Sequence, residues 1–221
     1  MPAPIREAYD RLFAAYGPQG WWPAETPLEV MVGAVLVQNT AWRNVEKAIA
    51  NLREEGVLSL EALHRLRVEE LAELIRSAGT FQVKAKRLKN LIDFVVERYG
   101  GDLEAMFSEN LASLREELLA IHGIGYETAD AILLYAGGLP TFVVDAYTAR
   151  VFKRHAWIEP EAGYIELKEL CESGLDADPV VFNEYHALLV EVGKRHCGRV
   201  AKCEGCPLQE LLPEGGVAEL S

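Results

Sequence analysis

A pair of glycines between two helical patterns constrains the fold of this chain more than any other feature. Ser113 and Glu116 make a capping box that predicts the start of one helix. Residues 126–135 carry apolar side chains at helical spacing and predict a second helix. The intervening Gly123-Ile124-Gly125 predicts a hairpin whose backbone N–H groups are not covered by side chains. Such a turn at a helix start favours a phosphate, although many Gly-x-Gly pairs only close a turn.

Apolar periodicity in the rest of the sequence predicts an all-α chain. Further helices are expected at residues 5–16, 27–37, 42–54, 59–66, 68–77, 82–98, 113–120, 146–155, 163–173 and 180–196. The one β-like run, residues 141–144, is too short and isolated to build a sheet. We expect a first lobe with roughly six helices in residues 26–137. The second lobe would combine residues 1–25 and 138–221.

The hairpin and the segment after it resemble a known family. Gly123-Ile124-Gly125, the loop Gly138-Leu139-Pro140 and Asp145 are similar to the helix-hairpin-helix and Gly/Pro/Asp signature of endonuclease III superfamily DNA glycosylases. The resemblance implies a two-lobed, all-α glycosylase of base excision repair that acts on double-stranded DNA with a damaged base. It implies that Gly123 and Gly125 bind a DNA phosphate and that Asp145 is catalytic. We expect such an enzyme to be a monomer.

One position departs from endonuclease III itself. The lysine that would attack the sugar falls, by its spacing to Asp145, on Glu127. A carboxylate cannot form the Schiff base that lyase chemistry needs, so a monofunctional glycosylase is expected. The sequence from Gly125 to Ala136 is similar to that of type III 3-methyladenine DNA glycosylases, which implies alkylated purines as substrates and places Glu127 at the substrate site.

The resemblance also assigns residues that handle the extruded base. Gln38, at the polar end of a predicted helix, falls at the position that fills the gap left by a flipped nucleotide. Trp42 matches an aromatic residue that stacks on the damaged base, and Trp21 or Trp22 would cover its other face. A methylated, cationic adenine would gain a cation–π attraction of about 0.5 to 2 kcal/mol there. Without the resemblance, Gln38 is a helix-end residue and Trp42 a core residue.

Asp145 has two compatible interpretations. As a carboxylate it would stabilise the oxocarbenium-like sugar or orient water, and a cationic leaving base needs no general acid. As the residue before a predicted helix it would serve as an N-cap. One side chain at the helix entrance can do both.

Composition limits where DNA can bind. With 221 residues and 50% hydrophobic residues the chain should be globular, and its best apolar run is broken by glycine and proline. We therefore expect no membrane span and a cytoplasmic, nucleoid-associated protein.

A net charge of −12 opposes broad contact with DNA, because duplex affinity rests on neutralised phosphates. Phosphate contacts should be local, with Lys84, Lys86 and Arg87 as candidates, although such a charge run can also be a solvated helix face.

Three cysteines near the C-terminus have metal-like spacing. Cys197, Cys203 and Cys206 resemble the loop that holds a [4Fe-4S] cluster in endonuclease III relatives. The fourth cysteine is missing, because its expected position holds Leu212. Three possibilities remain: a cluster with a non-cysteine fourth ligand, Cys171 as that ligand, or a degenerate loop with zinc or nothing. We favour a structural cluster with three cysteine ligands.

Two rival functions remain open at this stage. The first is a glycosylase of the same fold for another lesion, such as an oxidised pyrimidine, uracil or mismatched thymine. The second is a catalytically silent DNA-binding module, which the acidic composition and the missing cysteine suggest. An intact Asp145 argues against the second.

Overall fold

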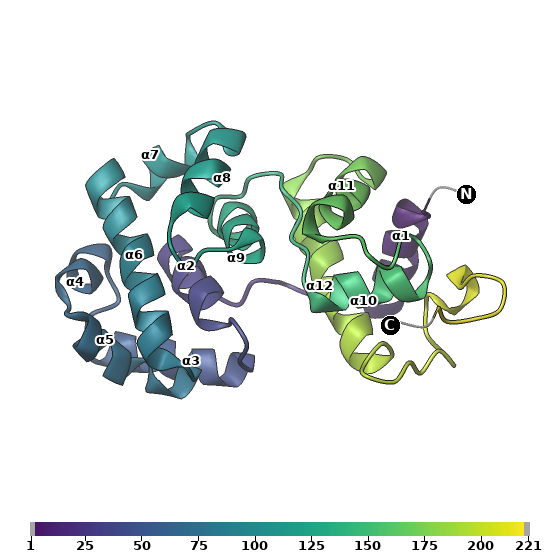
Figure 1. The fold of residues 1–221 in the computed structure, drawn as a ribbon, viewed down its shortest axis with the longest axis horizontal. Coiled ribbons are helices and arrows are strands. Elements are labelled where there is room, and N and C mark those ends of the chain that lie inside the picture. Colours follow the sequence, from purple (N-terminus) through teal and green to yellow (C-terminus); the bar gives the residue numbers. More distant parts are fainter. Residues whose placement is uncertain (1–2, 219–221) are drawn as a thin grey trace. The chain divides into compact units, whose positions relative to one another are not determined.

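The computed structural model describes residues 3–218 and is helical throughout (Figure 1). The described residues contain no β-strand, only an isolated bridge between Cys197 and Ala201. The predicted all-α class is therefore confirmed. No helix in this part of the chain is long and apolar enough to cross a membrane.

The chain divides into two compact units, residues 22–139 and residues 1–21 with 140–221. The first contains α2 (Pro27–Leu36), α3 (Trp42–Glu54), α4 (Leu60–Arg65), α5 (Val68–Leu74), η1 (Arg76–Ala78), α6 (Phe81–Tyr99), α7 (Leu103–Phe107), α8 (Leu111–Ala120), α9 (Tyr126–Ala131) and η2 (Ile132–Ala136). The second contains α1 (Ile5–Tyr16), α10 (Ala146–Arg154), α11 (Tyr164–Gly174), α12 (Pro179–Arg195) and η3 (Gln209–Leu211). In Figure 1 the purple α1 lies with the green α10 to α12, so both ends of the chain build this unit.

In the unit of residues 22–139, α2 is the central helix. Thr26 Oγ1 accepts the Glu29 N–H at 3.2 Å and Pro27 occupies N1, which together set the helix start. Nine of its ten residues are buried, because α2 packs against α3, α6, α9 and η2. The continuously apolar sequence of this helix therefore reflects a buried position, and its C-terminal end carries Gln38 toward the hairpin.

The structure differs from the sequence prediction at one helix start and contains one helix that was not predicted. The helix before the hairpin begins at Leu111 and is capped by Asn110, whose side chain accepts the N–H groups of Ala112 and Ser113. The capping box predicted at Ser113 is therefore wrong, because asparagine is an equally good cap and lies one turn earlier. The short helix α7 was not predicted, since five residues cannot show a helical period, although Asp102 caps it.

In the other unit, α12 packs against α1 and α10. Gly193 of α12 lies against Tyr147 of α10, where a Cβ atom would come 2.8 Å from Tyr147 Cβ. Gly174 of α11 lies equally close to Ile5 of α1. These small residues let the helices approach closely. Asp145 is the N-cap residue that precedes α10.

Candidate nucleic-acid interface and active-site residues

The hairpin has the geometry of an anion site. Gly123 adopts φ 97°, which side-chain-bearing residues rarely reach, and the Ile124 N–H donates to Ile121 O at 3.0 Å. Gly125 is the N-cap of α9, with open space where a Cβ would lie. No hydrogen bond within residues 3–218 uses the N–H of Gly123 or Gly125. Two donors are thus available to a phosphate oxygen at a helix start.

Two side chains of helix α6 contact this hairpin. Asn90 Nδ2 donates to His122 O at 3.0 Å. The aliphatic stem of Arg87 fills the space beside Gly123, where a Cβ atom would overlap with Arg87 Cγ and lie 2.8 Å from its Cδ. The second reason for glycine at this position is therefore close packing, in addition to the backbone angle.

Gln38 lies at the end of α2 and contacts the hairpin. Its Nε2 donates to Thr128 Oγ1 at 2.9 Å and to Gly123 O at 3.4 Å, while its Oε1 accepts from Arg87 Nη1. Both ends of the amide are therefore used, and they fix its orientation. The structure thus brings together three predicted residues, Gln38, Gly123 and Arg87.

Trp22 and Trp42 form an aromatic cluster with Tyr135. The centroids of the two indoles are 5.1 Å apart and their planes are nearly perpendicular, at 89°. The centroid of the Tyr135 ring lies 5.1 Å from that of Trp22, with the planes tilted by 41°. Gly33 makes room for both indoles, since its Cβ position is 3.3 Å from Trp42 and 3.4 Å from Trp22. Because the rings meet edge to face, a base enters between them only after one indole rotates.

Trp21 contacts a cation of its own unit. The Lys194 ammonium lies 5.8 Å from the Trp21 ring centroid. Of the two adjacent tryptophans, Trp22 contacts Trp42 directly.

A hollow of about 350 Å³ adjoins Trp42 in the same unit. Its lining consists of Pro23, Ala24, Glu25, Glu29, Trp42, Glu46, Ile49, Ala50 and Arg53. Arg53 pairs with the buried Glu29 at 2.5 Å. Three carboxylates against one guanidinium leave the lining negative, which favours a cationic ligand over a neutral one.

One residue of the basic run on α6, Lys84, does not lie at the surface as predicted. Lys84 is only 1% exposed, and its ammonium donates to Leu36 O at 2.9 Å and Ala78 O at 2.7 Å. Burial, together with Arg87, lowers the pKa of Lys84. The prediction of a phosphate contact at Lys84 is therefore wrong, because the side chain joins α6 to the ends of α2 and η1. Lys86 is exposed and remains available to DNA.

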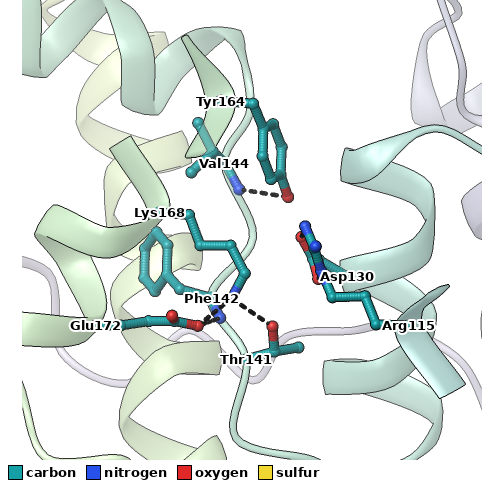
Figure 2. Close-up of polar contacts among 8 residues, drawn as sticks. All are labelled: Arg115, Asp130, Thr141, Phe142, Val144, Tyr164, Lys168 and Glu172. Carbon is teal, nitrogen blue, oxygen red and sulfur yellow. Dashed lines mark hydrogen bonds and ion pairs between the residues drawn. The ribbon is translucent and has the colours of Figure 1, made fainter. Parts of the chain in front are cut away.

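Glu127 occupies the first turn of α9 and is exposed, two residues after Gly125. The same helix carries the buried Asp130, which accepts two hydrogen bonds from Arg115 of α8 at 2.7 and 3.0 Å (Figure 2). Arg115 also lies 5.4 Å from the Tyr126 ring centroid. This bidentate ion pair ties the two helices that flank the hairpin.

Asp145 caps α10 and faces a histidine. Its Oδ1 accepts the Thr148 N–H at 2.8 Å and the Thr148 hydroxyl at 3.0 Å. Its Oδ2 lies 3.8 Å from Nε2 of the buried His186 on α12. Burial lowers the pKa of His186, and the Asp145 charge opposes that shift. The N-cap interpretation of Asp145 is thus present in the structure, and one carboxylate oxygen is left for other chemistry.

Helix α11 holds the extended segment that leads to Asp145. The Phe142 N–H donates to Glu172 at 2.8 Å and the Val144 N–H donates to Tyr164 Oη at 3.3 Å (Figure 2). Lys168 donates to Thr141 Oγ1 at 2.6 Å and also pairs with Glu172. Side chains of α11 therefore accept the backbone N–H groups of Phe142 and Val144, which would be paired with a neighbouring strand in a β-sheet.

Comparison with known proteins decides the family. Residues 32–176 match the model of the "HhH-GPD superfamily base excision DNA repair protein" family, about two thirds of the chain. The chain belongs to this family. It is therefore a helix-hairpin-helix DNA glycosylase of base excision repair, and the resemblance noted in the sequence is confirmed.

Several relatives of this glycosylase share most of its length. A Methanocaldococcus jannaschii protein, named provisionally as a DNA repair glycosylase, is 49% identical over 94% of both chains. Endonuclease III of Thermotoga maritima is 30% identical over 83% of this chain and 81% of its own. Among solved structures, Helicobacter pylori 3-methyladenine DNA glycosylase, bound to 1,N6-ethenoadenine, is 29% identical with a TM-score of 0.73, covering 85% of this chain and 97% of its own.

Three of the four cysteines of the glycosylase, Cys197, Cys203 and Cys206, lie in its C-terminal tail as free thiols. No three His, Cys, Asp or Glu side chains within residues 3–218 converge on one metal-ion position. A four-iron cluster is larger and holds its thiolates further apart. The Cys206 N–H donates to Cys203 O at 3.0 Å, so these two residues share one turn, and burial raises the pKa of the Cys206 thiol. Cys197 Sγ also accepts from Arg154 at 3.2 Å, a contact suited to a thiolate.

Two further groups bear on the missing fourth cysteine. Cys171 is fully buried in α11, and burial raises the pKa of its thiol. Tyr16 Oη is buried and has no hydrogen-bond partner within residues 3–218. Burial, with Cys206 as the next cause, raises the pKa of Tyr16 to about 12. When bound, a cluster would supply structural cross-linking of the tail through Cys197, Cys203 and Cys206.

Anaerobically purified protein is expected to be brown, with roughly four iron and four sulfide per chain. Replacing Cys203 with serine should lower the iron content and the visible absorption together, because it removes one thiolate. Iron, sulfide and zinc analyses measure this. Stoichiometric zinc, or no metal in anaerobically prepared protein, would contradict the cluster and leave a degenerate loop.

The sequence alone did not reveal several site residues. No sequence motif marks these residues, and the apolar periodicity of their helices gives no sign of a role at the site. They are His186, Tyr164, Lys168 and Glu172. Glu172 and Lys168 are four residues apart, which is the only local signal of their pairing. Their relation to Asp145 depends on tertiary packing.

Proposed function

We propose that this chain is a monofunctional DNA glycosylase that hydrolyses the N-glycosidic bond of alkylated purines, 3-methyladenine first. The observation that carries the substrate class is the Trp22–Trp42 cluster beside a negatively lined hollow. Indole faces attract a cationic base more than a neutral one, by about 0.5 to 2 kcal/mol. The carboxylates of the hollow act in the same direction. The similarity to a 3-methyladenine DNA glycosylase supports the same choice.

The roles of the other residues follow from their geometry. The N–H groups of Gly123 and Gly125 bind a phosphate of damaged duplex DNA, and the exposed Lys86 adds a local cation. Gln38 fills the stack after the damaged nucleotide leaves it, since the glycosidic carbon is not reachable inside the helix. Trp42, with Trp22, stacks on the extruded base, and Trp21 stays a secondary candidate.

Asp145 performs the bond-breaking step. Its carboxylate stabilises positive charge on the sugar as the base departs, and its Oδ2 is not used by the helix cap. A cationic purine is already a good leaving group, so no general acid is needed. Water then adds to the sugar and gives an abasic site. Glu127 offers no amine, so the strand stays uncut. The protein acts as a monomer in the compartment that holds the DNA.

A panel of damaged duplexes tests the substrate class. Wild-type protein should release 3-methyladenine and other cationic alkylated purines at least tenfold faster than uracil, mismatched thymine or oxidised pyrimidines, because only the former gain the cation–π attraction. Trp42→Ala should lose this preference, with Trp42→Phe as the control that keeps an aromatic face. Faster release of a neutral base would contradict the assignment and favour a same-fold enzyme for that lesion. Absence of release from every duplex would favour a silent DNA-binding module.

A further inference from the structure

The side chain of Gln38 is held in one orientation before DNA arrives. Its Nε2 donates to Thr128 Oγ1 at 2.9 Å, and Thr128 is buried. Its Oε1 accepts from the guanidinium of Arg87. A free glutamine would sample many rotamers, and ordering such a side chain is costly. Contacts at both ends of the amide remove that cost in advance.

The absence of a side chain at Gly123 lets Arg87 reach Gln38. Its stem occupies the space that Gly123 leaves open, and its Nη1 reaches Gln38 across the hairpin. Arg87 is half-buried, whereas the adjacent Lys86 is exposed. The Arg87 guanidinium therefore donates to the Gln38 amide, whereas the exposed Lys86 ammonium can contact a DNA phosphate.

We propose that Arg87 is a positioning residue that holds Gln38 ready to enter the DNA stack and couples it to the hairpin, instead of a phosphate contact. This inference rests on the proposed function only in taking Gln38 as the stack-filling residue. Because Arg87 contacts both Gln38 and Gly123, a phosphate bound at the hairpin and a glutamine entering the stack are held in register by one side chain. Thr128 fixes the same amide from the other side.

Salt dependence separates positioning from phosphate binding. A cation that neutralises one phosphate contributes about one to the slope of log affinity against log salt concentration. Lys86→Met should therefore reduce this slope by about one, measured with a duplex containing an abasic-site analogue. Arg87→Met keeps the aliphatic stem beside Gly123 and should leave the slope unchanged. A slope reduced by about one in Arg87→Met would overturn the proposal.

Base extrusion provides the second measurement. With 2-aminopurine next to the lesion, Arg87→Met should lower the flipped population at saturating protein about tenfold, as expected for losing the order of one glutamine side chain. The excision rate should fall by the same factor. In a Gln38→Ala background, Arg87→Met should have no further effect, because its partner is gone. An equal additional loss in that background would overturn the proposal.

Thr128→Val gives an independent variant with no change in charge. It keeps the side-chain shape and removes the acceptor of Gln38 Nε2, so it should show the same loss of extrusion as Arg87→Met. Thermal unfolding checks that both variants stay folded. If both variants are folded and both extrude the base normally, the contacts of the Gln38 amide do not position it for extrusion, and the proposal is overturned. The salt measurement uses an abasic-site analogue and needs neither the lesion nor excision, so it remains decisive even if the proposed substrate is wrong.

Discussion

Asp145→Asn is expected to slow base excision by about 10²–10³ while the protein stays folded. Asparagine is as good an N-cap as aspartate, so the contact with the Thr148 N–H survives and α10 keeps its start. The substitution removes the negative charge that we propose stabilises the cationic sugar, and this loss is the reason for the slower excision. Single-turnover release of 3-methyladenine measures the loss.

Two controls give this result its meaning. The thermal midpoint and the affinity for an abasic-site duplex should match those of wild-type protein, because neither depends on the charge at the sugar. Thr148→Val removes one contact to Asp145 Oδ1 and should reduce excision far less. Wild-type activity in Asp145→Asn would reduce Asp145 to a helix cap and overturn the mechanism.

Asp130→Ala should lower the free energy of unfolding by about 3–5 kcal/mol. Asp130 is fully buried and accepts two hydrogen bonds from Arg115, so its removal leaves a guanidinium without its carboxylate in a partly buried position. Urea unfolding of the whole chain measures the change.

The matched control is an exposed ion pair of the same type. Arg67 and Glu70 lie within 2.8 Å at the surface, and Glu70→Ala should change stability little, since solvent screens such pairs. Equal, small effects of Asp130→Ala and Glu70→Ala would show that the Arg115–Asp130 pair does not stabilise the helices around the hairpin.

Local signals were enough to predict much of the fold. The helix expected at residues 27–37 is present as α2, whose start is set by the local residues Thr26 and Pro27. The glycine hairpin and Asp145 as a cap were predictable because both depend on residues within a few positions in the chain. Ser113 failed because Asn110, an equally good cap, precedes it by one turn.

Contacts between distant residues could not be predicted in the same way. Lys84 belongs to a basic run that reads as a solvent-facing patch, and only the fold shows that two carbonyl groups bind its ammonium. The Trp22–Trp42 pair was expected to enclose a base, but the rings meet edge to face. The amide of Gln38 is bound by residues 49 and 90 positions away. Periodicity carries no information on such partners.

The most direct test of the account follows the fate of one damaged strand. Wild-type protein is incubated with a labelled duplex that contains a single 3-methyladenine, and the products are divided into untreated, alkali-treated and borohydride-treated samples. We expect free base in all samples, a cut strand only after alkali, and no protein–DNA adduct with borohydride, because Glu127 cannot form an imine. A strand cut without alkali, together with a borohydride-trapped adduct, would show that an amine attacks the sugar and would contradict the account.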